Sequence, residues 1–514
     1  MLPGLLASIH ELVGEDAQPT PIQAISLDYF FRERGPNKRN RTRGSSETLL
    51  AAETGSGKTL AYLMPVLQNL KETEAEVDAT EGRKMNSPRA LILAPTHELC
   101  RQLAQAVKQL THIDKLRTVC FSNPLPRKRT KDLYDEHATP DEFEAHREGS
   151  RPADIVVGTP SKMLEMFRLK DAVEEQLDEQ GEVVVRKDFG ESQGLERVQW
   201  VVVDEADVLF GHDFRPATRA LLHFVREARS RGKGESADAA ETTTDAAVAM
   251  PAVDATKVFT APPFNLLLST ATVSAALGTQ LAIFHPQMIQ LLSPNLHKLP
   301  RTLKTEHVAW RSGNRSADVA EKIFSIWTEE AREKRLSTGV KFLPADRGKV
   351  LVFCNTSAHA EKLGNELRAR AVNCIVLTSE SDLRRRGSNH HLDGFLTSKD
   401  GALGPKPPRA SLMKPLDPQL RRAAAAQAPE APAHLAPQVL VTTSLLSRGL
   451  DFRASVKYVI IMDEPQNMID FVHRAGRTGR AGQQGRVVLF GKGDKKSESP
   501  YIQEMRGRVR ALAA

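Results

Sequence analysis

The chain has 514 residues, of which 40% are hydrophobic and 26% charged, and its formal net charge is +7 with a pI of about 9.1. This length exceeds one ordinary hydrophobic core and predicts two or three domains of a globular protein. No apolar run reaches the ~18 residues that a membrane span needs, and the basic balance suits a polyanionic partner without identifying it.

The four cysteines do not show the spacing of a cysteine-based metal site. Cys100, Cys120, Cys354 and Cys374 lack metal-ligand spacing and lie in or beside apolar stretches. They are interpreted as reduced core residues, and a reducing intracellular compartment follows as the default. Residues 1–18 carry acidic side chains and little basic charge, so they do not match a signal or transit peptide.

The N-terminal region combines a helical pattern with a short polar motif. Apolar residues from Leu2 to Val13 recur at helical spacing. Pro19-Thr20-Pro21-Ile22-Gln23 follows, and the carboxamide of Gln23 can donate and accept one hydrogen bond each, which matches the adjacent N7 acceptor and N6 donor of adenine. A proline turn followed by a solvated glutamine is the alternative for this stretch taken alone.

The next motif is typical of a phosphate-binding loop. Thr48-Leu49-Leu50-Ala51 indicates a buried strand, Ala52-Glu53-Thr54-Gly55-Ser56-Gly57-Lys58-Thr59 the loop, and the apolar residues after it a helix. Gly55 and Gly57 let successive N–H groups point at one anion, and the helix N-terminus adds partial positive charge.

Two side chains of this loop carry specific chemistry. Lys58 can reach the β- and γ-phosphates of a nucleotide, and the Thr59 hydroxyl can ligate Mg²⁺. Ala52 stands where the general pattern has a glycine. A chance glycine-rich turn between a strand and a helix is the alternative for this motif alone.

Two further strands lead into helix starts. Residues 89–94 form an apolar strand that runs into Pro95 and Thr96, and residues 154–157 form another that runs into Thr159 and Pro160. Both helices then begin at the carboxyl edge of a parallel sheet, where ligands usually bind. The turn after residue 157, with its helix N-terminus, can bind a nucleic-acid phosphate.

An acidic motif and a threonine pair follow at later strand ends. Residues 200–203 deliver Asp204 and Glu205, and residues 265–269 deliver Thr270 and Thr272. Asp204 can hold Mg²⁺ through its water shell, and Glu205 can orient or deprotonate an attacking water. A helix N-cap is the alternative for two acidic residues at a strand end.

The alternation of strands and helices predicts an α/β protein with a parallel sheet in each half. The pattern breaks around residues 291–307, where we place the domain boundary, and resumes with strands in the second half. Polar or low-complexity stretches predict loops or flexible insertions. These stretches are residues 32–43, 71–88, 123–150, 229–258 and 401–437.

The second half has no phosphate loop but carries clustered arginines. Arg474, Arg477 and Arg480 recur every three residues after His473 and can converge on one anion. A solvated or nucleic-acid-binding patch is the alternative for such a run alone.

These motifs, taken in order, resemble those of the DEAD-box RNA helicases. The resemblance extends from about residue 19 to residue 480, and nine motifs in order are far more specific than any one of them. The motifs are PTPIQ, AETGSGKT, PTHEL, GTPSK, DEAD, TAT, VFCNT, SRGLD and HRAGRTGR. The family implies two tandem RecA-like domains, 1–300 and 301–495, that close over ATP and Mg²⁺ and bend single-stranded RNA, followed here by a basic tail, 496–514.

The resemblance implies a role for each motif residue. Glu205, Lys58, Asp204, Arg477 and Arg480 would be catalytic, the two arginines as arginine fingers. Gln23 would contact adenine, Asp451 ribose, and Thr54, Gly55, Ser56, Gly57, Lys58, Thr59 and Asp204 the phosphates or Mg²⁺, which Thr59 and Asp204 hold largely through water. Pro95, Thr96, Thr159, Pro160, Thr356 and Thr443 would contact RNA, and Thr270, Thr272 and His473 would couple ATP to closure.

The sequence also departs from the family pattern. Thr270 replaces a serine, His97 and Lys162 replace arginines, and the paired glycines expected near Ser122 are missing. The family's adenine-stacking aromatic would precede Met1, so we expect a chain that begins late and lacks any targeting sequence.

A closer resemblance is to fungal mitochondrial DEAD-box helicases that assist large-ribosomal-subunit assembly. It rests on PTHEL and on residues 442–452 and 461–485. It implies ribosomal RNA or a ribosomal precursor as partner, a mitochondrial matrix location and a monomer without a membrane span. The alternatives are an ATP-gated RNA clamp with little turnover and, third, a DNA helicase, which contacts to the 2′-OH would distinguish.

Overall fold

The computed structural model divides into two compact units, Met1–Leu296 and His297–Ala514, which are described separately. The described residues are 1–32, 46–75, 87–122, 152–169, 173–177, 183–185, 194–231, 264–294, 296, 302–338, 346–378, 381, 389, 392, 394–396, 437–443, 450, 452, 455–479 and 483–491.

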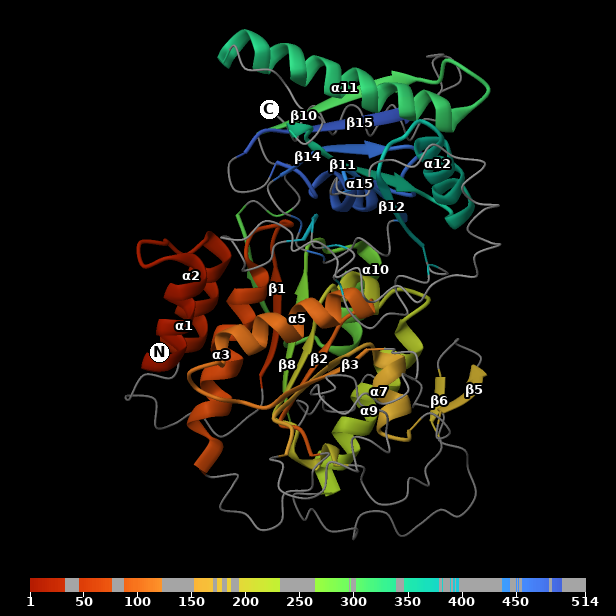
Figure 1. Cartoon of the computed structure of the whole chain (residues 1–514). Coiled ribbons are helices and arrows are strands. Elements are labelled where there is room, and N and C mark those ends of the chain that lie inside the picture. Colours follow the sequence, from red (N-terminus) through yellow and green to blue (C-terminus); the bar gives the residue numbers. More distant parts are fainter. Residues whose placement is uncertain are drawn as a thin grey trace, which may run out of the picture. The chain divides into compact units, whose positions relative to one another are not determined.

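The first unit is built on a seven-stranded sheet in the order β3-β4-β2-β7-β8-β1-β9, in which every pair is parallel (Figure 1). A separate antiparallel pair, β5 and β6, lies outside this sheet. The strands are β1 Glu47–Ala51, β2 Ala90–Leu93, β3 Thr118–Phe121, β4 Ile155–Gly158, β5 Val173–Leu177, β6 Val183–Val185, β7 Trp200–Val203, β8 Asn265–Thr270 and β9 Ile289–Leu292.

Helices cover both faces of this sheet because its strands are apolar on both sides. Alternate residues of one strand enter different cores: Leu50 packs with α1, α2, α3 and α5, and Leu49 with α7, α8, α9 and α10. The helical segments are α1 Pro3–Val13, α2 Pro21–Leu27, the π-helical turn η1 Asp28–Arg32, α3 Lys58–Glu72, α5 His97–Leu110, α7 Pro160–Met166, the 3₁₀ turn η3 Leu195–Arg197, α8 Ala206–Leu209, α9 Arg215–Arg231 and α10 Ala275–Phe284.

The second unit has a six-stranded parallel sheet in the order β10-β15-β14-β11-β13-β12. Val350 and Val352 of β11 pack with α11 and α12, whereas Leu351 and Phe353 share a core with Phe471 of α15. The elements, green to blue in Figure 1, are β10 Leu303–Ala309, α11 Arg315–Thr338, β11 Lys349–Cys354, α12 Ser357–Ala369, β12 Cys374–Leu377, β13 Val439–Thr443, β14 Val456–Ile461, α15 Met468–Ala475 and β15 Gly485–Gly491.

The predicted α/β class with two parallel sheets is confirmed. Three boundary predictions were wrong. The loop expected from Arg32 begins later, because Arg32 is the last residue of η1. The loop expected from Lys71 begins later, because α3 extends to Glu72, and the insertion expected from Arg229 begins after α9 ends at Arg231. The expected insertions over 33–43, 123–150 and 401–436 and the tail over 496–514 lie outside the described residues.

Within the described part of the chain, no helix combines the length and apolar character that a bilayer crossing requires. Three of the four cysteines, Cys100, Cys120 and Cys354, are buried, as expected for core residues.

Candidate functional site

The loop between β1 and α3 has the backbone geometry of an anion site. Gly55 and Gly57 adopt positive φ angles of 78° and 84°, a region that favours glycine. A Cβ on Gly57 would also lie 2.3 Å from Gln23 Nε2, so a side chain at this position would collide with the preceding motif. Gly57 is followed directly by the first turn of α3, whose N–H groups and partial positive charge face the loop.

Polar side chains within this loop are arranged around its own backbone. Lys58 Nζ donates to the carbonyl oxygens of Ala52 at 2.7 Å and Glu53 at 3.0 Å. Ser56 Oγ is buried and makes no hydrogen bond to the described residues. The loop therefore offers an ammonium group bonded to carbonyl oxygens and a buried hydroxyl that lacks a partner.

The Gln23 side chain contacts the loop. Thr20 and Gln23 form a capping box at the start of α2, in which the Thr20 N–H donates to Gln23 Oε1 at 2.9 Å. Gln23 Nε2 donates to the Gly57 carbonyl at 3.2 Å, and Thr20 Oγ1 donates to the Ser56 carbonyl at 2.7 Å. Each carboxamide atom thus retains one hydrogen-bonding position beyond these contacts.

Asp204, at the end of β7, is a buried carboxylate close to the start of α3. Tyr62 Oη donates to Asp204 Oδ2 at 3.3 Å, and Tyr62 also hydrogen-bonds with Thr59. Burial first, and then the charge of Glu205, raise the pKa of Asp204 to about 6, against the opposing charge of Lys58. A buried carboxylate in this state would be stabilised by a nearby cation.

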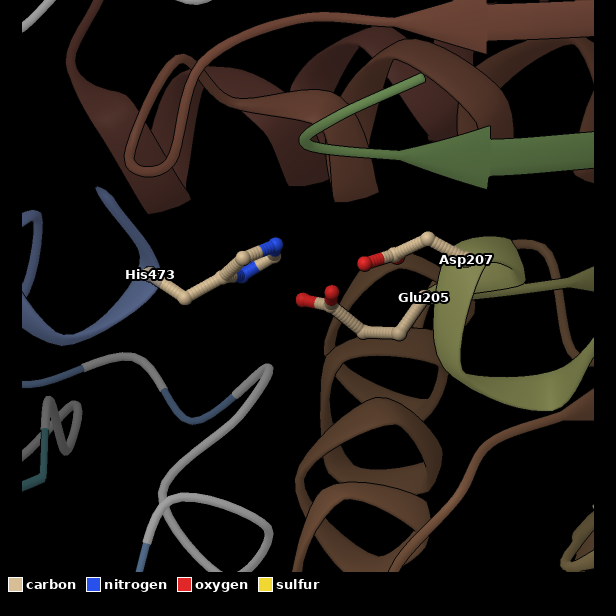
Figure 2. Close-up of side chains that lie close together, drawn as sticks. All are labelled: Glu205, Asp207 and His473. Carbon is tan, nitrogen blue, oxygen red and sulfur yellow. The ribbon is translucent and has the colours of Figure 1, made fainter. Parts of the chain in front are cut away.

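Glu205 has a strained backbone. Its φ and ψ are both 52°, a left-handed conformation that non-glycine residues rarely adopt. It occupies the N-cap position of α8, yet its side chain makes no capping hydrogen bond, so the helix-cap alternative does not account for it. Figure 2 shows the carboxylates of Glu205, in the turn after β7, and of Asp207, in the first turn of α8.

Asp207 is a residue to which the sequence motifs assigned no separate role. Thr270 Oγ1 donates to Asp207 Oδ1 at 3.0 Å, and Thr272 Oγ1 donates to Oδ2 at 3.2 Å. The two threonines are themselves linked, because the Thr272 N–H donates to Thr270 Oγ1 at 3.3 Å. Both oxygens of the Asp207 carboxylate therefore connect the end of β8 to residues 204–207, which we call the acidic turn.

Three of the four threonines predicted to contact RNA are helix N-caps. Thr96 accepts from the Leu99 N–H at the start of α5, Thr159 from the Lys162 N–H at the start of α7, and Thr356 from the His359 N–H at the start of α12. Thr96 and Thr159 are buried and Thr356 is exposed. Pro95 and Pro160, which flank the first two, are buried, and Thr443 is half-buried at the end of β13.

In the second unit, Arg474 belongs to an internal network. It pairs with Asp470 at 2.6 Å, both side chains being 2–3% exposed, and donates to Asn355 Oδ1 at 2.7 Å and to the Asp463 carbonyl at 3.2 Å. The idea that three arginines converge on one anion is therefore wrong for Arg474, because its donors are used inside the unit.

Arg477 and His473 are also buried in the second unit. Arg477 Nε donates to the His473 carbonyl at 3.0 Å, and Nη1 donates to the Leu450 carbonyl at 2.9 Å. His473, the third side chain labelled in Figure 2, lies on α15. Asp451 and Arg480 lie outside the described residues, so the structure places neither.

Comparison with family models gives two matches along the chain. The model described as DEAD/DEAH box helicase matches residues 21–276, and the model described as helicase conserved C-terminal domain matches residues 416–482. The first match contains the phosphate loop, the acidic turn and the threonine pair, and the second contains Arg474 and Arg477.

Relatives with assigned names extend over nearly the whole chain. It is 33% identical over 509 residues to ATP-dependent RNA helicase MRH4, mitochondrial, of Cryptococcus neoformans strain B-3501A, covering 95% of this chain and 81% of that protein. It is also 33% identical to the protein of the same name from strain JEC21, of which it spans 64%.

A solved structure shares the fold. Mss116p, a protein solved with single-stranded RNA and AMP-PNP, superposes with a TM-score of 0.62 at 17% identity, covering 100% of this chain and 76% of that one.

Proposed function

The chain belongs to the DEAD/DEAH-box helicase family and is an ATP-dependent RNA helicase of the DEAD-box type, and on this premise we propose which residues bind ATP, support its hydrolysis and contact RNA. The observation that carries the proposal lies within the first unit. There the glycine loop after β1, the acidic turn after β7 and the threonine pair after β8 follow three adjacent strands of one parallel sheet.

The loop between β1 and α3 is the ATP phosphate site. Its left-handed glycines, the first turn of α3 and the unpaired Ser56 hydroxyl supply donors to an anion. Lys58 Nζ exchanges the Ala52 and Glu53 carbonyls for phosphate oxygens when the nucleotide binds. Gln23, already fixed against Gly57, uses its remaining donor and acceptor positions for adenine.

Thr59 and Asp204 fit a magnesium ion. Both offer oxygen atoms, which Mg²⁺ prefers, and the raised pKa of buried Asp204 indicates a carboxylate that lacks a compensating cation. Tyr62 hydrogen-bonds with both residues and fixes their separation. A bound Mg²⁺ would neutralise part of the phosphate charge.

Glu205 orients the water that attacks the γ-phosphate and accepts its proton. The left-handed backbone at this residue turns its side chain away from capping α8. A strained backbone conformation persists only where the surrounding structure enforces it, and such conformations cluster at active sites. Asp207, fixed by Thr270 and Thr272, keeps the acidic turn aligned with the end of β8 and so links the ATP site to the rest of the motif set.

The second unit supplies arginines to turnover. Charge that develops on the γ-phosphoryl group needs cationic donors, and among its described motif residues the first unit offers Lys58 but no arginine cluster. Arg477 and Arg480 are proposed to supply them, with His473 coupling ATP to closure. The network of Arg474 with Asp470 fixes α15 to the Asp463 carbonyl, in the segment that follows β14.

RNA binds mainly through its backbone. The capped N-termini of α5, α7 and α12 present N–H groups and partial positive charge to phosphates, and buried Thr96 and Thr159 act by shaping those turns. Thr443 and the two flanking prolines complete the proposed contact set.

The names of the relatives point to a cellular setting. Both Cryptococcus proteins are named mitochondrial. We propose that this chain works as a monomer in the mitochondrial matrix on ribosomal RNA or a ribosomal precursor, which crosslinking followed by sequencing of the bound RNA would test.

Glu205→Gln in the full chain tests the proposed chemistry. Loss of the base lowers RNA-stimulated phosphate release by about 10²–10⁴-fold, whereas ATP binding stays close to wild type because Lys58 is unchanged. The matched control is Asp213→Asn. Asp213 lies a few residues after the same motif, and its side chain is 88% exposed. Near wild-type turnover of Glu205→Gln would show that Glu205 does not activate the attacking water.

A further inference from the structure

The residue directly after the edge strand β9 contacts the phosphate loop, although it belongs to none of the motifs. Ser293 is only 5% exposed. Its N–H donates to the carbonyl of Ala51, the last residue of β1, at 2.8 Å. Its Oγ donates to Glu53 Oε2, within the loop, also at 2.8 Å. The end of β9 therefore holds both the strand before the loop and the first half of the loop itself.

Glu53 is the residue around which the loop turns. Its carbonyl oxygen accepts from the Ser56 N–H at 3.3 Å and from Lys58 Nζ at 3.0 Å. Its side-chain carboxylate accepts the hydrogen bond from Ser293, which lies far along the chain, after β9. Fixing this one residue therefore restrains the turn and the resting position of the ammonium group.

The charge of Glu53 gives the contact a second consequence. A carboxylate in a loop that binds polyphosphate repels the ligand unless it is held away and its charge is partly offset. The Ser293 hydroxyl does both, because a hydrogen bond to a charged acceptor is stronger than one between neutral groups. Removing it would free the carboxylate and let the loop sample conformations that do not bind.

We propose that Ser293 is a positioning residue for the phosphate loop and that it sets ATP affinity through Glu53. The inference rests on the proposed function of the loop as the ATP site. The first unit ends at Leu296, whose N–H donates to the Ser293 carbonyl at 3.1 Å. Leu296 is thereby linked through Ser293 to Ala51 and Glu53 of the proposed phosphate site.

The test compares Ser293→Ala and Ser293→Thr in the full chain. Loss of the hydroxyl raises the Kd of a fluorescent ATP analogue and the KM for ATP by about tenfold. The kcat with saturating RNA stays within about twofold, because Ser293 does not touch the reacting atoms. Ser293→Thr, which keeps the hydroxyl, restores the affinity.

A double-mutant cycle with Glu53→Ala shows whether the two residues act together. If they do, Ser293→Ala adds little to the effect of Glu53→Ala. Ser8→Ala is the matched control, since Ser8 is a fully buried serine whose hydroxyl bonds to the Gly4 carbonyl in α1. It leaves KM unchanged.

Three results would overturn the inference: wild-type affinity in Ser293→Ala, strictly additive effects in the cycle, or a loss of kcat and thermal stability that Ser293→Thr does not restore. The variant Lys58→Ala distinguishes a wrong role for Ser293 from a wrong assignment of the loop as the ATP site. If Lys58→Ala abolishes ATP binding while Ser293→Ala does not change it, only the role of Ser293 is wrong. If Lys58→Ala binds ATP normally, the loop is not the ATP site.

Discussion

The two units share an architecture but differ in what lies at the carboxyl edges of their sheets. In the first, β1 leads into a glycine loop, and the buried acidic residues follow β7. In the second, the equivalent edge carries Asn355, Asp463 and Arg474, whose polar groups are bonded to one another. We propose the edge of the first sheet as the nucleotide site and the arginines of the second unit as contributors to turnover.

The contrast shows that charge alone does not mark a catalytic group. Asp204 in the first unit has a pKa raised to about 6, mainly by burial. Arg474 in the second is just as buried, but its guanidinium is fully engaged by Asp470 and by backbone and amide oxygens. We propose a cation as the partner of Asp204, whereas Arg474 already has an ion-pair partner within its own unit.

The largest expected effect tests whether the second unit contributes to turnover. Arg480→Ala should lower the ATPase rate by about 10³–10⁵-fold, because the developing phosphoryl charge loses its arginine. Arg480→Lys should restore little, since a point charge cannot replace the planar fork. Phosphate release with saturating RNA is the measurement, and RNA affinity should change less than turnover.

Removing Arg474 tests its structural role. Arg474→Ala leaves Asp470 buried without its ion pair and should destabilise the second unit by about 3–5 kcal/mol. The control is Arg370→Ala, because Arg370 and Glu366 form a partly exposed pair worth no more than about 1 kcal/mol. Urea unfolding of the full chain measures both, and equal losses would contradict the distinction.

Asp207→Asn tests the link between the acidic turn and the end of β8. An amide keeps one acceptor oxygen, so the side chain at 207 can no longer accept from both threonine hydroxyls, which costs about 1–3 kcal/mol. Strand separation per ATP hydrolysed should therefore fall about tenfold. Asp213→Asn should leave that ratio unchanged, and an unchanged ratio in Asp207→Asn would show that the link does not serve coupling.

The smallest effect concerns the surface of the second unit. Burial alone would raise the pKa of Glu306, but hydrogen bonds from Lys322 and Arg486 outweigh it and lower that pKa. A carboxyl group with a lowered folded-state pKa stabilises above its unfolded-state pKa and loses that contribution as the pH falls. Arg486→Met should therefore flatten the acid side of the stability curve by less than about 1 kcal/mol. An unaltered acid limb in thermal melts would refute this.

The central strands could be predicted from the sequence because parallel strands buried on both faces are continuous apolar runs. The strand predicted at residues 200–203 coincides with β7. The strand predicted at residues 265–269 ends one residue before β8 does. The edge strand β10 was missed, since its alternating exposed residues form no such run. The helix α11, Arg315–Thr338, follows the predicted break at residues 291–307 and was also missed.

The motifs name candidate site residues, but they do not give the contacts of those residues. No spacing shows that both threonines bind Asp207, that Arg477 donates to the carbonyl of Leu450, or that Ser293 reaches the phosphate loop. These contacts join residues distant in sequence, and they depend on strand order. The roles of Arg480 and Asp451 remain predictions from the motifs.

The central claim is that the first unit holds ATP while turnover needs the second. The most direct measurement compares nucleotide binding and phosphate release, with saturating RNA, for the full chain and for residues 1–296, whose two cores lie within that unit. We predict that residues 1–296 bind ATP weakly and hydrolyse almost none. Hydrolysis by residues 1–296 at the rate of the full chain would contradict the claim.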